Sequence, residues 1–72
     1  MFERVVKILS KYTEERQIQP RSTLAVDLGL SSFDVVEIVA DFEEEFQIEI
    51  SDRDMGKFVC VEDILGYLKR RA

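Results

Sequence analysis

Two adjacent serines, Ser31 and Ser32, are the residues of this chain best placed for covalent chemistry, because they stand just ahead of an acidic run. A serine hydroxyl acts as a nucleophile when a base, most often histidine, takes its proton. The chain contains no histidine, which also removes the commonest zinc ligand. We therefore expect no catalysis by the chain alone and no metal site. A hydroxyl at the start of a helix can instead cap that helix or carry an attached group.

The two serines differ in their expected roles at the start of the helix that follows them. If Ser31 is the N-cap, Asp34 falls at position N3 and completes a capping box of the form S-x-x-D. In the same register Leu30 and Val35 form a hydrophobic staple. If Ser32 were the cap, Val35 would fall at N3 and the box would be lost. The sequence therefore predicts that Ser31 caps the helix and that the hydroxyl of Ser32, at N1, points outward.

The start of a helix favours a negatively charged group, so Ser32 is suited to carrying a phosphate ester. Free backbone N–H groups and the positive end of the helix dipole face whatever is attached there. Local chemistry alone leaves open a simpler interpretation, in which Ser32 is a solvated residue of the first helical turn.

The elements that position these serines are predicted to be helices in one small domain spanning residues 1–72. A chain of 72 residues with 46% hydrophobic side chains buries a modest core and has little room for an enclosed catalytic cavity. Apolar residues at helical spacing predict long helices over Phe2–Arg16, over Ser32–Phe46 and from Val61 onward. A short turn capped by Ser51 should precede the last helix.

A long loop is expected between the first two helices, over Gln17–Leu30. It contains proline and glycine but also several apolar residues, so we expect it to lie against the helices. The predicted fold class is therefore all-α. It is a small antiparallel four-helix bundle with three long helices, one short helix and a long first loop.

The helix after the serines is predicted to have an acidic face, which would suit a basic protein surface. Residues 27–54 hold ten acidic side chains and one basic side chain, which disfavours binding to nucleic acid. On a helical wheel Phe33 and Val36 lie beside the core positions and are expected to be partly exposed. The alternative is a solvated face, although clustered carboxylates repel one another and no lysine of the same helix offsets them. The acidic face comprises Asp34, Glu37, Asp41, Glu44 and Glu45.

The remaining features indicate a monomer located in the cytosol. The chain has no apolar run long enough to span a membrane and no secretory signal. Cys60 is the only cysteine, so no internal disulfide can form, and we expect its side chain to pack as a small apolar group. The segment "SDRDMGKFVCVE" has the length of a calcium-binding loop. Gly56 and Glu62 fit that pattern, but Arg53 and Met55 would be poor ligands, which excludes a true EF-hand.

The stretch "DLGLSSFDVVEIVADFEEEF" resembles the central motif of the acyl carrier proteins, and the resemblance continues through "QIEISD" and "VCVEDILGYL". It implies a four-helix bundle in which Ser32 carries 4′-phosphopantetheine, derived from coenzyme A, through a phosphodiester. The thiol of that arm would hold acyl groups as thioesters. Implied partners are a phosphopantetheinyl transferase, acyltransferases and ketosynthases, all docking through basic surfaces. The implied partner-facing positions are Phe33, Asp34, Val36, Glu37 and Asp41.

Two departures from the family pattern bear on the pathway. Ser31 stands where the family often has aspartate, and Phe33 replaces the usual leucine. Because of these departures, we expect either a carrier for fatty-acid synthesis or a carrier for polyketide or other specialised synthesis. A peptidyl or aminoacyl carrier is a further alternative, although such carriers usually lack so acidic a helix. An unmodified acidic interaction domain is another.

Overall fold

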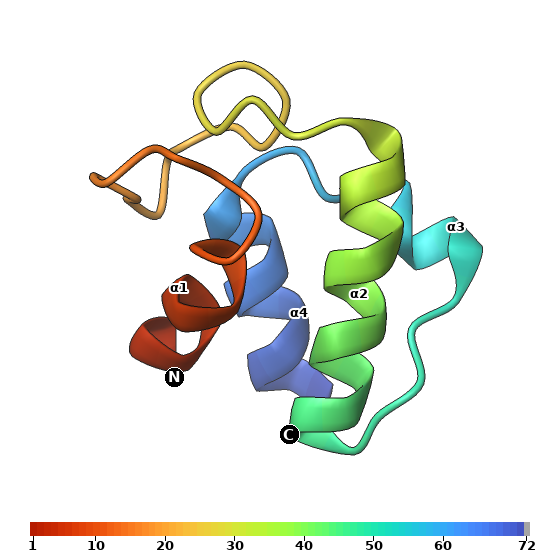
Figure 1. The fold of residues 1–72 in the computed structure, drawn as a ribbon. Coiled ribbons are helices and arrows are strands. Elements are labelled where there is room, and N and C mark those ends of the chain that lie inside the picture. Colours follow the sequence, from red (N-terminus) through yellow and green to blue (C-terminus); the bar gives the residue numbers. More distant parts are fainter. Residues whose placement is uncertain (72) are drawn as a thin grey trace.

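The computed structural model describes residues 1–71, and in that range the chain forms four helices. They are α1 (Phe2–Leu9), α2 (Ser32–Phe46), α3 (Asp52–Met55) and α4 (Val61–Arg71). No strand occurs among these residues, where one isolated antiparallel bridge joins Thr23 to Cys60. In Figure 1, α1 runs opposite to α2 and α4, and the long first loop crosses the end where α2 and α4 begin. The predicted all-helical bundle is confirmed.

Apolar residues from α1, α2, α4 and the first loop form one core. Their spacing of three or four residues within each helix puts them on one face, so each helix contributes a stripe. Phe42 is fully buried, as are Val5 and Leu9 of the facing helix α1. None of the helices in residues 1–71 is long and apolar enough to cross a membrane. The other buried helical side chains include Ile8, Ile38, Val39, Val61, Ile64, Leu65, Tyr67 and Leu68.

The first helix is shorter than the sequence predicts, because it ends at Leu9 and not at Arg16. The backbone tightens after Leu9, where the N–H of Tyr12 donates to the carbonyl of Leu9 at 2.9 Å. The hydroxyl of Thr13 then donates to the carbonyl of Leu28 at 2.7 Å and accepts the N–H of Glu15, which holds the chain in a loop conformation. Tyr12 fits the helical stripe but lies beyond the helix.

Backbone hydrogen bonds fasten the first loop to the segment ahead of α4. The N–H of Leu24 donates to the carbonyl of Val59 at 2.9 Å, and the N–H of Leu30 donates to the carbonyl of Leu24 at 2.9 Å. Leu24, Leu28 and Leu30 are all buried. The prediction that this loop lies against the helices is confirmed.

The short helix α3 is held mainly by polar contacts. The N–H of Asp54 donates to the Ser51 hydroxyl at 3.1 Å, so the predicted cap is confirmed. The hydroxyl of Tyr67 donates to the Asp54 carboxylate at 2.9 Å, and the guanidinium of Arg71 donates to the carbonyl of Glu49 at 3.0 Å. No residue of α3 is fully buried, so these contacts and the packing of Met55 against the core set its position.

Two glycines give matched predictions for stability. Gly66 lies inside α4, and a Cβ added there would meet the Arg70 Nη1 atom at 3.4 Å, an ordinary contact with a flexible side chain. Gly66→Ala should therefore raise the free energy of unfolding by about 0.5–1 kcal/mol. Gly29 has a φ of +66°, a backbone conformation that is strained for any residue with a Cβ. Gly29→Ala should therefore lower the free energy of unfolding by about 1–2 kcal/mol. Chemical denaturation of both variants checks this, and a destabilised Gly66→Ala protein would contradict it.

Candidate functional site

Ser31 caps α2 through a complete capping box. The N–H of Asp34 donates to the Ser31 hydroxyl at 3.1 Å, and the N–H of Ser31 donates to the Asp34 carboxylate at 3.0 Å. Leu30 is buried and Val35 packs against the core, as the predicted staple requires. The predicted capping register is therefore confirmed, and the Asp34 carboxylate is turned back toward Ser31.

Ser32 is the first residue of α2, and its side chain is exposed. Among residues 1–71 no protein group accepts the backbone N–H of Ser32 or of Phe33. These two N–H groups and the helix dipole can therefore favour an anion attached to the Ser32 hydroxyl. The carboxylate of Asp34 is committed to the cap, so Ser32 has no base held against its own hydroxyl.

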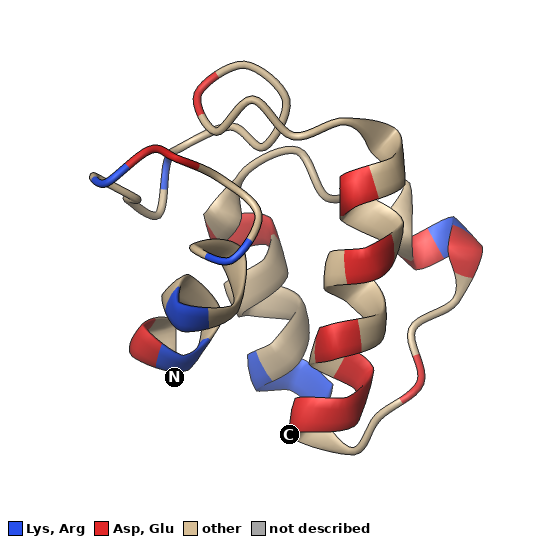
Figure 2. Ribbon diagram, in the orientation of Figure 1, with Lys and Arg blue, Asp and Glu red and all other residues tan. Residues whose placement is uncertain are grey.

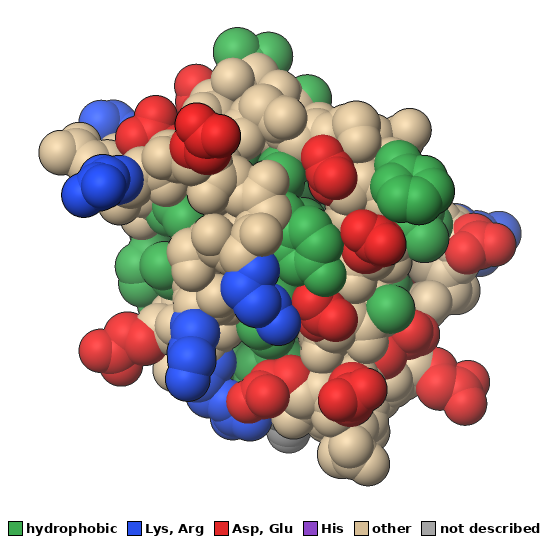
Figure 3. All heavy atoms as spheres, viewed as in Figure 1, with side chains coloured by type: hydrophobic (Ala, Val, Ile, Leu, Met, Phe, Trp, Pro, Cys, Tyr) green, Lys and Arg blue, Asp and Glu red, His purple; other side chains and the backbone are tan. Residues whose placement is uncertain are grey.

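Apolar side chains flank Ser32 on the surface, at positions predicted to be exposed. Phe33 is 72% exposed and Val36 is 53% exposed. Glu37, one residue further along α2, is exposed and forms no ion pair with the other described residues. Figure 3 shows acidic and hydrophobic side chains side by side along this part of the surface. The site therefore presents apolar contacts and negative charge next to the serine.

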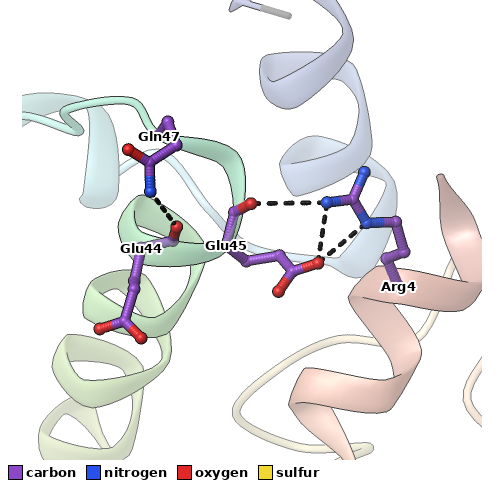
Figure 4. A network of polar contacts seen from close by, with 4 residues as sticks. All are labelled: Arg4, Glu44, Glu45 and Gln47. Carbon is purple, nitrogen blue, oxygen red and sulfur yellow. Dashed lines mark hydrogen bonds and ion pairs between the residues drawn. The ribbon is translucent and has the colours of Figure 1, made fainter.

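Basic residues of the N-terminal segment offset part of the negative charge on α2. Figure 2 shows acidic positions along α2 and basic positions on the neighbouring helix α1. The guanidinium of Arg4 donates twice to the Glu45 carboxylate, at 3.0 and 2.8 Å (Figure 4). It also lies 4.4 Å from the ring centre of Phe46. The repulsion expected from the acidic helix is thus reduced by residues outside it.

Asp41 is also bound by residues of the N-terminal segment, so its carboxylate is less accessible to a partner protein. It is half-buried, accepts a hydrogen bond from the Tyr12 hydroxyl and lies 3.6 Å from the Lys11 ammonium. Glu37 and Glu44 form no ion pair within residues 1–71. Sequence reasoning missed these pairings, although residues 1–23 contain more basic than acidic side chains and could have indicated them.

Cys60 sits at the start of α4, and its surroundings suit packing better than reaction. The Asp63 carboxylate accepts the backbone N–H groups of Val59 and Cys60, each at 3.0 Å, and these two bonds lower the pKa of Asp63. Burial raises the pKa of the Cys60 thiol, so the thiol stays protonated near neutral pH.

Comparison with known proteins adds the chemistry that this geometry suits. Residues 3–68 match the family described as "Phosphopantetheine attachment site". The chain is also 40% identical over 70 residues to a protein of Schizosaccharomyces pombe named "Putative acyl carrier protein, mitochondrial". The alignment covers 93% of this chain and 62% of that relative, so the chain spans less than two thirds of the relative's length.

The same comparison corrects one expectation. The predicted cytosolic location is wrong on this evidence, because the name of the relative places that protein in the mitochondrion. The prediction relied on a single cysteine and a lack of apolar runs. A lone cysteine excludes an internal disulfide in any compartment, so it carries no information about which compartment holds the chain.

The contact between Tyr12 and Asp41 predicts a pH dependence. The hydrogen bond to Asp41 raises the pKa of Tyr12 from 10.0 to about 12. Because the folded pKa is the higher one, this contribution to stability is complete below about pH 10 and is lost as the pH rises through about 12. Tyr12→Phe should lower the free energy of unfolding at neutral pH and remove the late-titrating tyrosine. Denaturation curves and tyrosinate absorbance measure both effects. Equal stability of the two proteins at neutral pH would contradict the assignment.

Proposed function

The chain belongs to the acyl carrier protein family, and from that membership we propose that it carries acyl groups as thioesters on a 4′-phosphopantetheine arm attached to Ser32. The observation that most directly supports Ser32 as the attachment site is that the two serines have different structural roles. Ser31 is committed to the cap, whereas Ser32 is exposed beside free N–H groups. Modification of Ser32 would therefore leave the helix start intact.

The residues around Ser32 fit a phosphodiester. Within residues 1–71 two N–H groups have no protein acceptor, and they and the helix dipole favour its negative charge. Ser32 and its neighbours Phe33 and Val36 are exposed. The arm supplies a terminal thiol that forms thioesters with acyl groups. Since the chain has no histidine and Asp34 is turned toward the cap, we propose that the transferase supplies the base that takes the proton of the Ser32 hydroxyl.

Under this proposal the chain is a monomeric, non-catalytic substrate of other enzymes. Its partners are a phosphopantetheinyl transferase, acyltransferases, ketosynthases and other acyl-processing enzymes. The cargo is an intermediate of fatty-acid, polyketide or related synthesis. A peptidyl or aminoacyl cargo is less well supported, because such carriers usually lack so acidic a helix after the serine. The mass of the group on the protein isolated from its own cells distinguishes these cargoes from one another and from an unmodified interaction domain.

The docking surface for these partners is proposed to lie along α2, with Glu37 as its main charge. Phe33 and Val36 are exposed beside it, whereas the carboxylates of Asp34 and Asp41 already have partners within the chain. A partner with a basic residue opposite Glu37 and an apolar patch opposite Phe33 would match this arrangement. The role of Asp41 would then be to hold the first loop against α2.

The attachment point can be tested with coenzyme A and a phosphopantetheinyl transferase. One arm should be added to the wild-type chain, and Ser32→Ala should abolish the addition without changing the free energy of unfolding by more than about 0.5 kcal/mol. Ser31→Ala should lower that free energy by about 0.5–2 kcal/mol through loss of the cap, yet still accept the arm. Intact mass and peptide mapping measure the outcome. An arm mapped to Ser31 would overturn the assignment.

Charge-reversal variants distinguish the exposed carboxylate of Glu37 from the carboxylate of Asp41, which is bound within the chain. Glu37→Lys should lower the kcat/KM of arm addition about tenfold at low salt, less so as salt rises, and should leave the melting temperature unchanged. Asp41→Lys should lower the melting temperature by several degrees, because it removes the acceptor of Tyr12 and places a cation beside Lys11. Transferase kinetics and thermal unfolding test the pair. Identical melting curves for both variants would show that the Asp41 contacts contribute no stability.

A further inference from the structure

A groove on the surface of α1 gathers positive charge beside the acidic helix α2. It has a volume of about 410 Å³ and extends from α1 and the turn after it to the last turn of α2. Figure 3, in the orientation of Figure 1, shows basic side chains over α1 beside the acidic side chains of α2. The basic groove, as we call it, is lined by Arg4, Lys7, Ile8, Ser10, Lys11 and Glu45.

Two cationic side chains of the basic groove keep donors that no group of residues 1–71 accepts. Arg4 contacts Glu45 through its Nε and Nη2 atoms, and Figure 4 shows its remaining nitrogen pointing away from Glu45. The Lys7 side chain is exposed and forms no ion pair among the described residues, although Glu3 lies four positions before it on α1. The groove therefore has two donors with which it can bind an anion from outside the chain.

The three cations of the groove share one side of α1 and of the turn that continues it. Arg4, Lys7 and Lys11 are spaced by three and four residues, which brings their side chains together and makes them repel one another. Glu45 and Asp41 of α2 offset the charges of Arg4 and Lys11. Lys7 has no such acid among the described residues, so the groove keeps a net positive charge.

The surroundings of the groove decide which kind of anion fits it. Residues 27–54 hold ten acidic side chains and one basic side chain, and Glu45 of that segment lines the groove itself. An extended polyanion, such as a nucleic acid or an anionic membrane surface, would be repelled by α2 wherever it reached past the groove. A single acidic side chain of a protein, with basic residues around it, would instead match the groove and α2 together.

A protein that docks along α2 to reach Ser32 can also cover the groove. The 15 residues of α2 span about 22 Å, and a typical interface of about 800 Å² per partner is roughly 30 Å across. A row of carboxylates attracts a basic surface but gives it little register, because a shift of one helical turn presents another carboxylate. A cationic groove at one end of α2 distinguishes the two ends and so can set the orientation of the partner.

Resting on the proposed function, we propose that the basic groove binds an acidic side chain of the phosphopantetheinyl transferase that docks along α2. The acidic helix attracts the enzyme, and the contact at Arg4 and Lys7 fixes which way round the enzyme lies. In that orientation the active site of the transferase meets Ser32, at the opposite end of α2 from the groove. Lys7 is then a positioning residue, because it lies on α1 and acts through the orientation of the enzyme.

The kinetics of arm addition from coenzyme A, with the transferase of the same cells, test this proposal through the sign of a charge effect. Lys7→Glu and Arg16→Glu each add two negative charges to a chain whose net charge is −5, and Arg16 lies in the first loop outside the groove. If the groove were only solvated, both variants would attract a basic enzyme more strongly, and kcat/KM would not fall. We expect Lys7→Glu to lower kcat/KM about three- to tenfold at low salt through a higher KM, whereas Arg16→Glu should not lower it.

The salt dependence and a neutral variant complete the test. The decrease caused by Lys7→Glu should shrink as the salt concentration rises, because the contact joins exposed charges. Lys7→Gln removes the charge but keeps a good helix former, so it should cause a smaller decrease at an unchanged melting temperature. A lower melting temperature for Lys7→Glu, together with a wild-type kcat/KM for Lys7→Gln, would indicate a damaged helix and overturn the groove contact.

Failure of the groove contact can be told apart from failure of the carrier function. A wild-type chain that accepts no arm at Ser32 would remove the carrier function, and the groove contact with it. A chain that is loaded at Ser32, but whose kcat/KM changes equally in Lys7→Glu and Arg16→Glu, would overturn the groove contact alone.

Discussion

The unpaired N–H groups at the start of α2 are the constraint on which the rest of this site depends. A helix leaves its first four N–H groups without internal partners. Here Ser31 accepts the N–H of Asp34, and the N–H groups of Ser32 and Phe33 have no acceptor among the residues that the structure describes. Because one serine takes the structural role, its neighbour is left exposed next to positive partial charge. The attachment proposed at Ser32 would be favoured by this combination, which two adjacent hydroxyl side chains supply here.

The acidic helix that follows has some carboxylates paired within the chain and others that face outward. Arg4 neutralises Glu45 and covers Phe46, while Lys11 and Tyr12 hold Asp41. These contacts join α1 and the start of the first loop to α2. Surface ion pairs individually contribute little, so their main effect is to decide which carboxylates face outward. The side of α2 nearest Ser32 keeps its free charge at Glu37, where a docking enzyme would meet it.

Much of the fold and the capping register could be predicted from local patterns. The box between Ser31 and Asp34 depends on residues three apart, and the core stripe of α2 follows helical periodicity. The early end of α1 could not be predicted from local patterns. Tyr12 fits the helical stripe, but the hydroxyl of Thr13 donates to the carbonyl of Leu28, which lies fifteen positions further along the chain. The same limit applies to Arg4 and Asp41, whose partners are far away in sequence. Val26 and Val59 look like ordinary core residues until the fold shows them exposed.

The backbone hydrogen bonds that hold the first loop affect the order in which the chain folds. Three backbone hydrogen bonds join the loop to the segment around the start of α4, pairing Pro20 with Glu62, Ser22 with Val61 and Leu24 with Val59. The paired residues are 35 to 42 positions apart in the chain. Closing so long a segment costs conformational entropy before any contact offsets it, so these bonds form late. During synthesis an isolated helix of this length is marginal in water, and the loop beside it lacks its partners Val59, Val61 and Glu62 until α4 follows. We therefore expect a modifying enzyme to find a finished surface around Ser32 only on a chain whose last helix is already in place.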